Sequence, residues 1–237
     1  MRIVVWNCRM ALAKKCELLY GLRPDVAVIP ECSRESMLAC EREGFHTRWW
    51  GENKHKGLGV LAAKPWGLED VYRRRRQPRQ RWIAPVRVRG PRDFLLLAVW
   101  ACPVGTVREN NYVGQTYEAI VRHPRWFCAD TPTVICGDFN SNVIFDAGRK
   151  KRKHSAIVRL LGDRGAVSAY HAFFAEEQGK ETRPTHYLLF REQRPFHLDY
   201  IFVPKEWRVT DFQVGTYEDW RAFSDHVPIL VDVRDAD

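Results

Sequence analysis

The stretch Thr133–Asn142, TVICGDFNSN, constrains the fold of this chain more than any other part of the sequence. Its apolar run, Val134-Ile135-Cys136, has the composition of a buried strand, and Gly137 ends that run at Asp138, Asn140 and Asn142. A carboxylate and two carboxamides are therefore expected at the C-terminal end of a strand, where layered α/β proteins tend to carry catalytic groups. The alternative interpretation is an Asx-rich turn between a strand and a helix.

Other apolar runs also carry polar or charged side chains at or near their ends. Near the N-terminus, RIVVWN ends in Asn7 and DVAVIPE ends in Glu31. Near the C-terminus, HLDYIFV contains Asp199, and SDHVPILVDV places Asp225 and His226 directly before an apolar run. Packing alone does not account for such groups at strand edges along the whole chain. We therefore expect them to converge on one site.

Taken in this order, GDFN, LDYIFV and SDHVP, together with Asn7 and Glu31, resemble the endonuclease/exonuclease/phosphatase superfamily. That superfamily includes exonuclease III-type AP endonucleases, DNase I, and inositol polyphosphate and sphingomyelin hydrolases. The resemblance extends over nearly the full chain. It implies an α/β (α+β) fold, a four-layered sandwich in which two mixed β-sheets lie face to face and are flanked by helices.

Length and composition favour a single domain over residues 1–237. The chain has no Gly/Ser/Pro-rich linker, and its 45% hydrophobic residues, 9 Trp among them, can fill a sizeable core. The 7 Cys include no CxxC pair and are interpreted as reduced thiols, and no apolar stretch approaches the roughly 20 residues of a membrane span. We therefore expect a cytoplasmic protein without a membrane partner, and the sequence indicates no obligate protein partner.

Hydrophobic periodicity predicts the order of the secondary-structure elements. Strands are expected at residues 2–6 and 25–29, and helices at 11–22, 34–43, about 110–127 and 156–165. Residues 45–100 are strand-rich, and the remaining strands are expected at about 185–190, 196–203, 208–215 and 227–233. This order fits the layered architecture that the resemblance implies.

Phosphodiester hydrolysis requires neutralised phosphoryl oxygens, a deprotonated water in line and a stabilised leaving oxygen. Glu31 is the natural ligand for a hard divalent cation, because Mg²⁺ keeps several waters and takes one or two protein carboxylates. We expect Asn7, and Asp225 directly or through water, to complete the shell of Mg²⁺, with Mn²⁺ as a substitute. The alternative for Glu31 is a solvated acid at a helix start after Pro30.

His226 is the candidate general base or transition-state hydrogen-bonding group, because only His has an unperturbed pKa near neutrality. Asp199 lies inside a strand, where an acid is costly to bury, and is therefore expected to hold the His226 ring. The resemblance implies the same pair, and it implies that Asp138 positions the nucleophile and Asn140 grips the phosphate. The alternative for SDHVP is a capped turn.

One residue that the resemblance implies is missing. Relatives carry a Tyr or His at the end of the strand corresponding to residues 95–103, where it contacts the phosphate or protonates the leaving group. This chain reads AVWACPVG there, with Trp100 and Ala101 at the candidate positions, and an indole N–H cannot deliver a proton as an acid. The alternatives are that the metal or its water stabilises the leaving oxygen, or that Tyr112 or Gln115 substitutes.

Basic segments indicate contact with a polyanion. The chain carries 38 Lys+Arg against 29 Asp+Glu, a formal charge of +9, which attracts nucleic acid or anionic surfaces. The stretch Arg73–Arg81, RRRRQPRQR, and the segment AGRKKRKH after GDFN could contact phosphates or form solvated faces. Further candidate substrate contacts are Asn142, Trp100, His154 and His186.

Three functions follow as alternatives. The first is a Mg²⁺-dependent phosphodiesterase acting on DNA or RNA, with His226 as general base and the metal bound to Glu31. The second is a phosphatase or phosphodiesterase for a small or lipid phosphate ester, which the missing Tyr or His keeps open, although no long amphipathic segment supports a lipid substrate. The third is a catalytically silent nucleic-acid-binding module, which would bind DNA in a salt-sensitive way without turnover.

Overall fold

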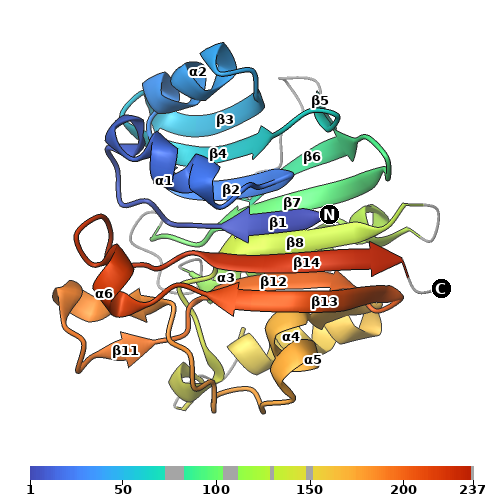
Figure 1. Ribbon diagram of the computed structural model, residues 1–237. Coiled ribbons are helices and arrows are strands. Elements are labelled where there is room, and N and C mark those ends of the chain that lie inside the picture. The colour runs from blue at the N-terminus through green and yellow to red at the C-terminus, as the bar shows by residue number, and fades with distance from the viewer. Residues whose placement is uncertain (73–82, 104–111, 129–130, 148–151, 236–237) are drawn as a thin grey trace.

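The first sheet contains strands from both ends of the chain (Figure 1). The computed structural model describes residues 1–72, 83–103, 112–128, 131–147 and 152–235. In the first sheet β1 runs parallel to β2 and antiparallel to β14. The strand order is β13 (Trp207–Val214), β14 (Ile229–Asp235), β1 (Arg2–Val5), β2 (Val26–Cys32), β4 (Lys56–Ala62) and β3 (His46–Asn53).

The second sheet is built from the middle of the chain. Here β7 and β8 are parallel, and β12 is antiparallel to β8. The order is β5 (Gly67–Asp70), β6 (Ile83–Arg89), β7 (Phe94–Trp100), β8 (Thr133–Asp138), β12 (Asp199–Pro204) and β9 (Ala166–Ser168). A separate two-stranded ladder joins β10 (His186–Tyr187) to β11 (Pro195–Phe196). The predicted fold, with two mixed sheets in an α/β protein, is confirmed.

Alternate residues of each strand point into different cores, which produces the layers. Ile3 and Val5 pack between the sheets together with Leu96 of β7, whereas Val4 packs on the outer face of the first sheet. That face is covered by the 3₁₀ helix η1 (Leu12–Lys14), α1 (Cys16–Gly21) and α2 (Arg34–Arg42). The outer face of the second sheet is covered by α3 (Val113–Arg122), η4 (Pro124–Phe127) and α4 (His154–Asp163).

Shorter helices connect the strands at the margins of the sheets. They are η5 (Val143–Phe145), α5 (Ala169–Phe174), η6 (Leu188–Phe190) and α6 (Tyr217–Trp220). Within the described ranges, no helix combines the length and the apolar character needed to cross a membrane.

Several expected elements differ from the structure; for example, the helix expected at about 110–127 ends at Arg122 and is followed by η4. The helix expected at 11–22 is divided into η1 and α1, because Lys15 between them has a non-helical φ of −131°. The Lys15 ammonium instead donates to the carbonyls of Cys8, Met10 and Phe223. The strand expected at 185–190 is limited to β10, because Leu189 and Phe190 adopt left-handed φ angles of 58° and 56° and close the turn η6. The local pattern of apolar residues in the sequence reveals neither the break at Lys15 nor the turn at Leu189 and Phe190.

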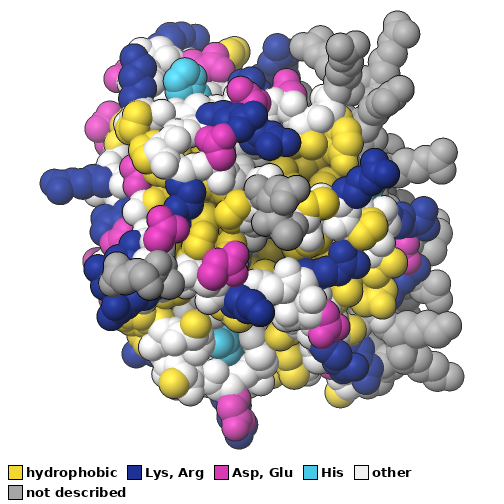
Figure 2. All heavy atoms as spheres, turned by 90° about the vertical axis from the view of Figure 1, so that its right-hand side faces the viewer, with side chains coloured by type: hydrophobic (Ala, Val, Ile, Leu, Met, Phe, Trp, Pro, Cys, Tyr) yellow, Lys and Arg dark blue, Asp and Glu magenta, His cyan; other side chains and the backbone are white. Residues whose placement is uncertain are grey.

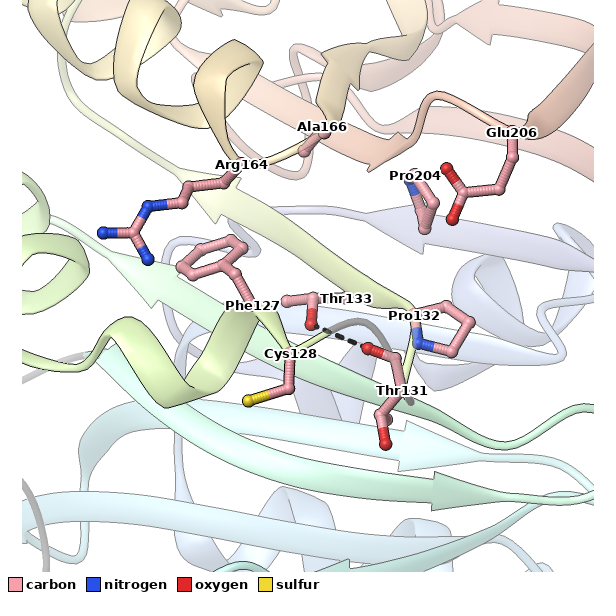
Figure 3. Close-up of a pocket in the computed structure, with 10 residues that line it drawn as sticks. Phe127, Cys128, Thr131, Pro132, Thr133, Arg164, Ala166, Pro204 and Glu206 are labelled. Atoms are coloured by element: carbon pink, nitrogen blue, oxygen red, sulfur yellow. Dashed lines mark hydrogen bonds between the residues drawn. The ribbon is translucent and has the colours of Figure 1, made fainter.

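The N-terminal end of β8 borders a small pocket, which Figure 3 shows in close-up. Its volume is about 110 Å³, and Thr133, Arg164 and Glu206 are among the residues that line it. Asp138 is at the other end of β8, about 16 Å away at roughly 3.3 Å per strand residue. Figure 2 shows the side of the molecule at the right of Figure 1, where Lys and Arg side chains are interspersed with Asp and Glu.

Candidate active site at the strand ends

Five predicted residues lie where strands of the two sheets end. Asn7 follows β1 closely, Glu31 lies near the end of β2, and His226 precedes β14. Asp138 ends β8, and its partner across the antiparallel ladder is Asp199, the first residue of β12. The Asn7 amide donates to Asp138 Oδ2 at 2.9 Å, so the two sheets meet at this point.

Gly137 is required for the position of Asp138. Its φ is +143°, and a Cβ built at this position would overlap the carbonyl oxygen of Val99 on the neighbouring β7. A side chain here would therefore separate β8 from β7. The glycine of GDFN allows the close strand contact that ends with Asp138 beside Trp100.

Asp138 is fully buried and accepts bonds from two asparagines. Asn7 Nδ2 and Asn140 Nδ2 both donate to Oδ2 at 2.9 Å, and the Asn140 backbone N–H donates to Oδ1 at 2.8 Å. Burial raises the pKa of Asp138 to about 7; Asp199 acts in the same direction, while His226 and the Asn7 bond oppose it. This carboxyl group can therefore exchange a proton near neutral pH.

Asn140 lies beside Asp138 and also reaches the end of β7. Besides its bond to Asp138, Asn140 Nδ2 donates to the Ala101 carbonyl at 2.9 Å, and its φ of 45° is left-handed. Both hydrogens of the amide are thus used within the protein. In this structure Asn140 orients Asp138, and the predicted grip on a phosphate requires one of these bonds to be released.

His226 is buried between two carboxyl groups. Its Nδ1 lies 2.8 Å from Asp199 Oδ2, and its Nε2 lies 4.0 Å from Asp138 Oδ2. Burial lowers the pKa of His226, but the charges of Asp199 and Asp138 outweigh burial and raise that pKa to about 10. The two flanking carboxyl groups therefore favour the imidazolium form of the ring, with its Nδ1 proton directed at Asp199. This state favours the predicted transition-state hydrogen-bonding role over the predicted role as a general base.

Thr185 holds Asp199 in place, and no sequence pattern points to it. Its Oγ1 donates to Asp199 Oδ2 at 2.7 Å and accepts from the backbone N–H groups of Leu198 and Asp199. Ser224 fixes His226 in a similar way, since its Oγ accepts from the His226 N–H and donates to the Asn7 carbonyl. The position of Ser224 in SDHVP is a weak signal for this role, whereas Thr185 has none.

Glu31 projects from an irregularity at the end of β2. The register of β2 against β4 shifts between Pro30 and Cys32, and Glu31 has a left-handed φ of 63°. Its Oε1 is 3.4 Å from Asn7 Nδ2, and its Oε2 is 2.8 Å from Lys56 Nζ. Glu31 is therefore a strand-end carboxylate that faces Asn7, not an acid at the start of a helix.

Asp225 lies beside His226 and pairs with basic side chains. Its Oδ2 is 3.4 Å from Arg9 Nε and 4.0 Å from His186 Nε2. The Arg9 backbone N–H donates to Asn7 Oδ1 at 3.1 Å, which links Asp225 to the other predicted metal ligands. The centre of the His186 ring is 4.4 Å from that of His226, and burial lowers the pKa of His186 to about 3. His186 therefore adjoins the site as a neutral ring.

The donor groups at the strand ends are of the type that a hard cation prefers. In the part of the chain that the structure describes, one group of three acidic or His ligands has atoms within 4.8 Å of one another: Asp138, Asp199 and His226. Glu31 is not in that group, but Asn7 Nδ2 contacts both Glu31 and Asp138, so two carboxylates converge on one amide. Carboxylate and amide oxygens are suitable ligands for Mg²⁺.

Three predicted contacts lie around the end of β7. Trp100 is 5% exposed and pairs with Asp138 in the parallel ladder. Gln115 is buried, and its Nε2 donates to the Cys102 carbonyl. Tyr112 precedes α3, and burial raises the pKa of its hydroxyl, as does the charge of Asp138. Tyr112 is therefore protonated at neutral pH and can donate a hydrogen bond.

Asn142 and His154, two predicted substrate contacts, lie in the interior of the protein. Asn142 is 1% exposed; its Nδ2 donates to Tyr200 Oη at 2.9 Å, and its Oδ1 accepts from the Ile144 N–H and caps η5. His154 is fully buried beside Phe139 and Tyr200, and burial lowers its pKa to about 4. Asn142 is thus a cap and His154 a neutral core residue, because both side chains are directed into the packing under α4.

The basic segments lie largely outside the described residues. The Arg-rich stretch 73–81 falls entirely outside them, as do residues 148–151 of the second segment. Of the remainder, Arg152 pairs with Glu118, and Lys153 is the N-cap of α4. The contact of these segments with phosphates stays a prediction.

Comparison with known proteins gives one family and several similar folds. A sequence model described as Endonuclease/Exonuclease/phosphatase family matches residues 4–226. An AP endonuclease from Archaeoglobus fulgidus has a TM-score of 0.71 at 14% identity, with 98% of each chain covered. The human Nocturnin catalytic domain with bound sulfate has a TM-score of 0.68 at 17% identity, covering 100% of this chain and 94% of that one.

A 3′ phosphatase, NExo from Neisseria, bound to a product DNA hairpin, has a TM-score of 0.67 at 16% identity, with 99% of each chain covered. No curated protein gives a significant sequence match. At these identities the solved structures show a shared fold over nearly the whole length.

Proposed function

We propose that this chain, which belongs to the endonuclease/exonuclease/phosphatase family of metal-dependent phosphoester hydrolases, hydrolyses phosphodiester bonds of nucleic acid. One observation carries the proposal: the buried series Asp199, His226 and Asp138, with separations of 2.8 Å and 4.0 Å. An imidazole oriented by one carboxylate and facing a second carboxyl group of raised pKa suits proton transfer and charge stabilisation at a phosphate.

The residues at the strand ends fit a divalent cation. Glu31 would hold the ion through its carboxylate and Asn7 through its amide oxygen, since the two side chains already lie side by side, with Asn7 Nδ2 3.4 Å from Glu31 Oε1. Asp225 would join them through water after release from Arg9. When bound, Mg²⁺ or Mn²⁺ would neutralise charge on the phosphoryl oxygens.

Asp138 is the proposed base of the reaction. Asp138 would orient an attacking water, and its raised pKa would let it take up the proton of that water near neutral pH. Asn140 keeps the carboxyl group oriented through two hydrogen bonds. His226, charged because of Asp199, would donate from Nε2 to a phosphoryl oxygen on which negative charge grows. We therefore assign the general-base role to Asp138 in place of His226.

Charge supports nucleic acid as the substrate. A formal charge of +9 favours association with a polyanion. Among the proteins of similar fold, the Archaeoglobus protein is an AP endonuclease and the Neisseria phosphatase is bound to DNA. These proteins of similar fold guide the choice of test substrates. Because their identities are low, experiment decides between DNA, RNA and damaged DNA.

A small phosphate ester is the second candidate substrate. Trp100, next to Asp138, cannot supply a proton to a leaving group, and a small ester with a good leaving group does not need one. A catalytically silent nucleic-acid-binding module is the third candidate.

The test incubates the protein with supercoiled plasmid, abasic duplex, single strands, RNA and a chromogenic phosphodiester, with Mg²⁺, with Mn²⁺ or with a chelator. We expect metal-dependent cleavage of a nucleic acid that is lost in His226→Ala and Glu31→Ala. The matched controls His46→Ala and Glu35→Ala change exposed residues and should leave cleavage intact. Hydrolysis of the chromogenic ester alone would favour the second candidate. Salt-sensitive binding without product would favour the third.

A further inference from the structure

Lys15 donates to three backbone carbonyls that belong to two separate loops. Its Nζ lies 2.6 Å from the carbonyl oxygen of Cys8, 3.0 Å from that of Met10 and 2.5 Å from that of Phe223. An ammonium group has three N–H donors, so each of them has an acceptor here. The half-buried Lys15 side chain therefore joins the loop that follows β1 to the loop that precedes β14.

The loop after β1 has an uncommon backbone conformation. Arg9, Met10 and Ala11 have successive φ angles of 47°, 66° and 50°, which are left-handed values that cost free energy in residues other than glycine. Such a conformation persists only where surrounding contacts hold it. The Met10 N–H donates to the Glu31 carbonyl at 3.1 Å, and the Arg9 N–H donates to Asn7 Oδ1 at 3.1 Å. The strained stretch is therefore hydrogen-bonded to two predicted metal ligands.

The loop before β14 contains the third predicted metal ligand, Asp225. Ser224 in this loop donates from Oγ to the Asn7 carbonyl at 2.8 Å, and Asp225 Oδ2 lies 3.4 Å from Arg9 Nε. The two loops are thus joined by the Ser224 hydroxyl, by the ion pair of Arg9 and Asp225, and by the Lys15 ammonium. Of these three connections, the Lys15 ammonium bonds to the most backbone groups.

We propose that Lys15 is a positioning residue that sets the relative placement of Asn7 and Asp225 for the divalent cation. This assignment rests on the proposed function. Through the carbonyls of Cys8 and Met10, Lys15 holds the left-handed backbone directly after Asn7. Through the carbonyl of Phe223, it holds the backbone two residues before Asp225. Because the ammonium bonds to backbone oxygens and not to the ligand side chains, Lys15 acts on the cation through these two residues.

A variant without the ammonium separates positioning from charge. Removal of a positive charge near a cation site should strengthen cation binding by Coulomb's law, whereas loss of a positioning contact should weaken it. We expect Lys15→Met to raise the dissociation constant for Mn²⁺, measured by equilibrium dialysis with the metal alone, by about 10-fold or more. The binding that Glu31→Ala abolishes identifies the site. Lys14→Met removes the same charge from the exposed neighbouring position and should not weaken Mn²⁺ binding.

A second measurement needs no metal. In Lys15→Met the backbone N–H of Met10, which donates to the Glu31 carbonyl, should exchange with solvent deuterium about 10-fold faster than in Lys14→Met, because the left-handed stretch is released. The assignment requires both weaker Mn²⁺ binding and faster exchange, and the absence of either effect overturns it. Faster exchange with Mn²⁺ binding as tight as in the wild type would mean that Lys15 is only structural.

Folding of the variants is checked by far-UV circular dichroism. If Lys15→Met does not fold, Lys15→Arg replaces it, since a planar guanidinium keeps the charge but does not reproduce the three donors of an ammonium group. Mn²⁺ binding weaker by about threefold or more in Lys15→Arg would then support the assignment, and wild-type affinity would overturn it.

Failure of the proposed function would give a different result. A wild-type protein that binds Mn²⁺ but hydrolyses neither a nucleic acid nor the chromogenic diester would contradict the proposed hydrolysis, and dialysis would still decide the role of Lys15. A wild-type protein that hydrolyses its substrate while Mn²⁺ affinity is the same in Lys15→Met would overturn the role of Lys15 alone.

Discussion

The amide of Asn7, just after β1, and the carboxyl group of Asp138, at the end of β8, are joined by a 2.9 Å hydrogen bond that links the two sheets. Asn7 is 2% exposed and Asp138 is fully buried, so this contact lies inside the sandwich. Glu31 reaches the same amide from β2, and His226 approaches the same carboxyl group from the loop before β14. The candidate site therefore exists only when both sheets are assembled.

Replacing Asp199 with Asn should abolish most activity without unfolding the protein. An amide cannot stabilise the imidazolium of His226, which Asp199 now holds at 2.8 Å. We expect kcat for phosphodiester hydrolysis to fall by about 100-fold or more. The control Asp163→Asn changes an exposed residue of α4. Near-wild-type kcat in Asp199→Asn would contradict the orienting role of Asp199.

Thr185 should support Asp199 through its hydroxyl alone. In Thr185→Val the N–H groups of Leu198 and Asp199 lose their acceptor, and Asp199 loses a donor. We expect the free energy of unfolding, measured by urea denaturation, to fall by about 2 kcal/mol. Thr185→Ser keeps the hydroxyl and should recover most of this loss. A valine variant as stable as the serine variant would argue against the role.

Gly137 should be intolerant of any side chain. In Gly137→Ala the new methyl group would meet the Val99 carbonyl at a φ that L-residues rarely adopt. Urea denaturation should show a loss of about 3 kcal/mol or more. Gly162→Ala is the matched control, because its methyl group has open space in α4 and should stabilise the protein by about 0.5–1 kcal/mol. Equal stability of the two variants would contradict the close approach of β7 and β8.

His154 should make the protein sensitive to acid. Burial lowers its folded pKa from 6.5 to about 4, so unfolding lets the imidazole take up a proton. The contribution of neutral His154 to stability is thus fully present above pH 6.5 and is lost as pH falls through about 4. In His154→Phe, the decrease in Tm between pH 6.5 and pH 4 should be smaller than in the wild type. The exposed control His55→Phe should retain the wild-type decrease; parallel Tm curves for all three proteins would contradict the prediction.

The sequence was a good guide where the relevant property is local. Apolar runs such as Val134–Cys136 become buried strands because their composition and period fit a two-sided sheet. Asn7 and Glu31 lie together because the parallel strands β1 and β2 end at the same edge of the first sheet. Asp138 joins them from the second sheet. The sequence was a poor guide at Lys15. There the backbone interrupts the helix expected at 11–22, and the side chain donates to three backbone carbonyls.

The amino-acid sequence alone determined the order of most strands and the set of acids, amides and imidazole at their ends, because periodicity and strand-end chemistry are written in neighbouring residues. The arrangement in two mixed sheets was implied by the family resemblance. The tertiary structure decided which atoms of that set meet. Asn142 and His154 face the core, Thr185 supports Asp199, and Lys56 reaches Glu31. The protonation of His226 was also decided there, because it depends on distances to carboxylates on β8 and β12 that the pairing and packing of strands fix.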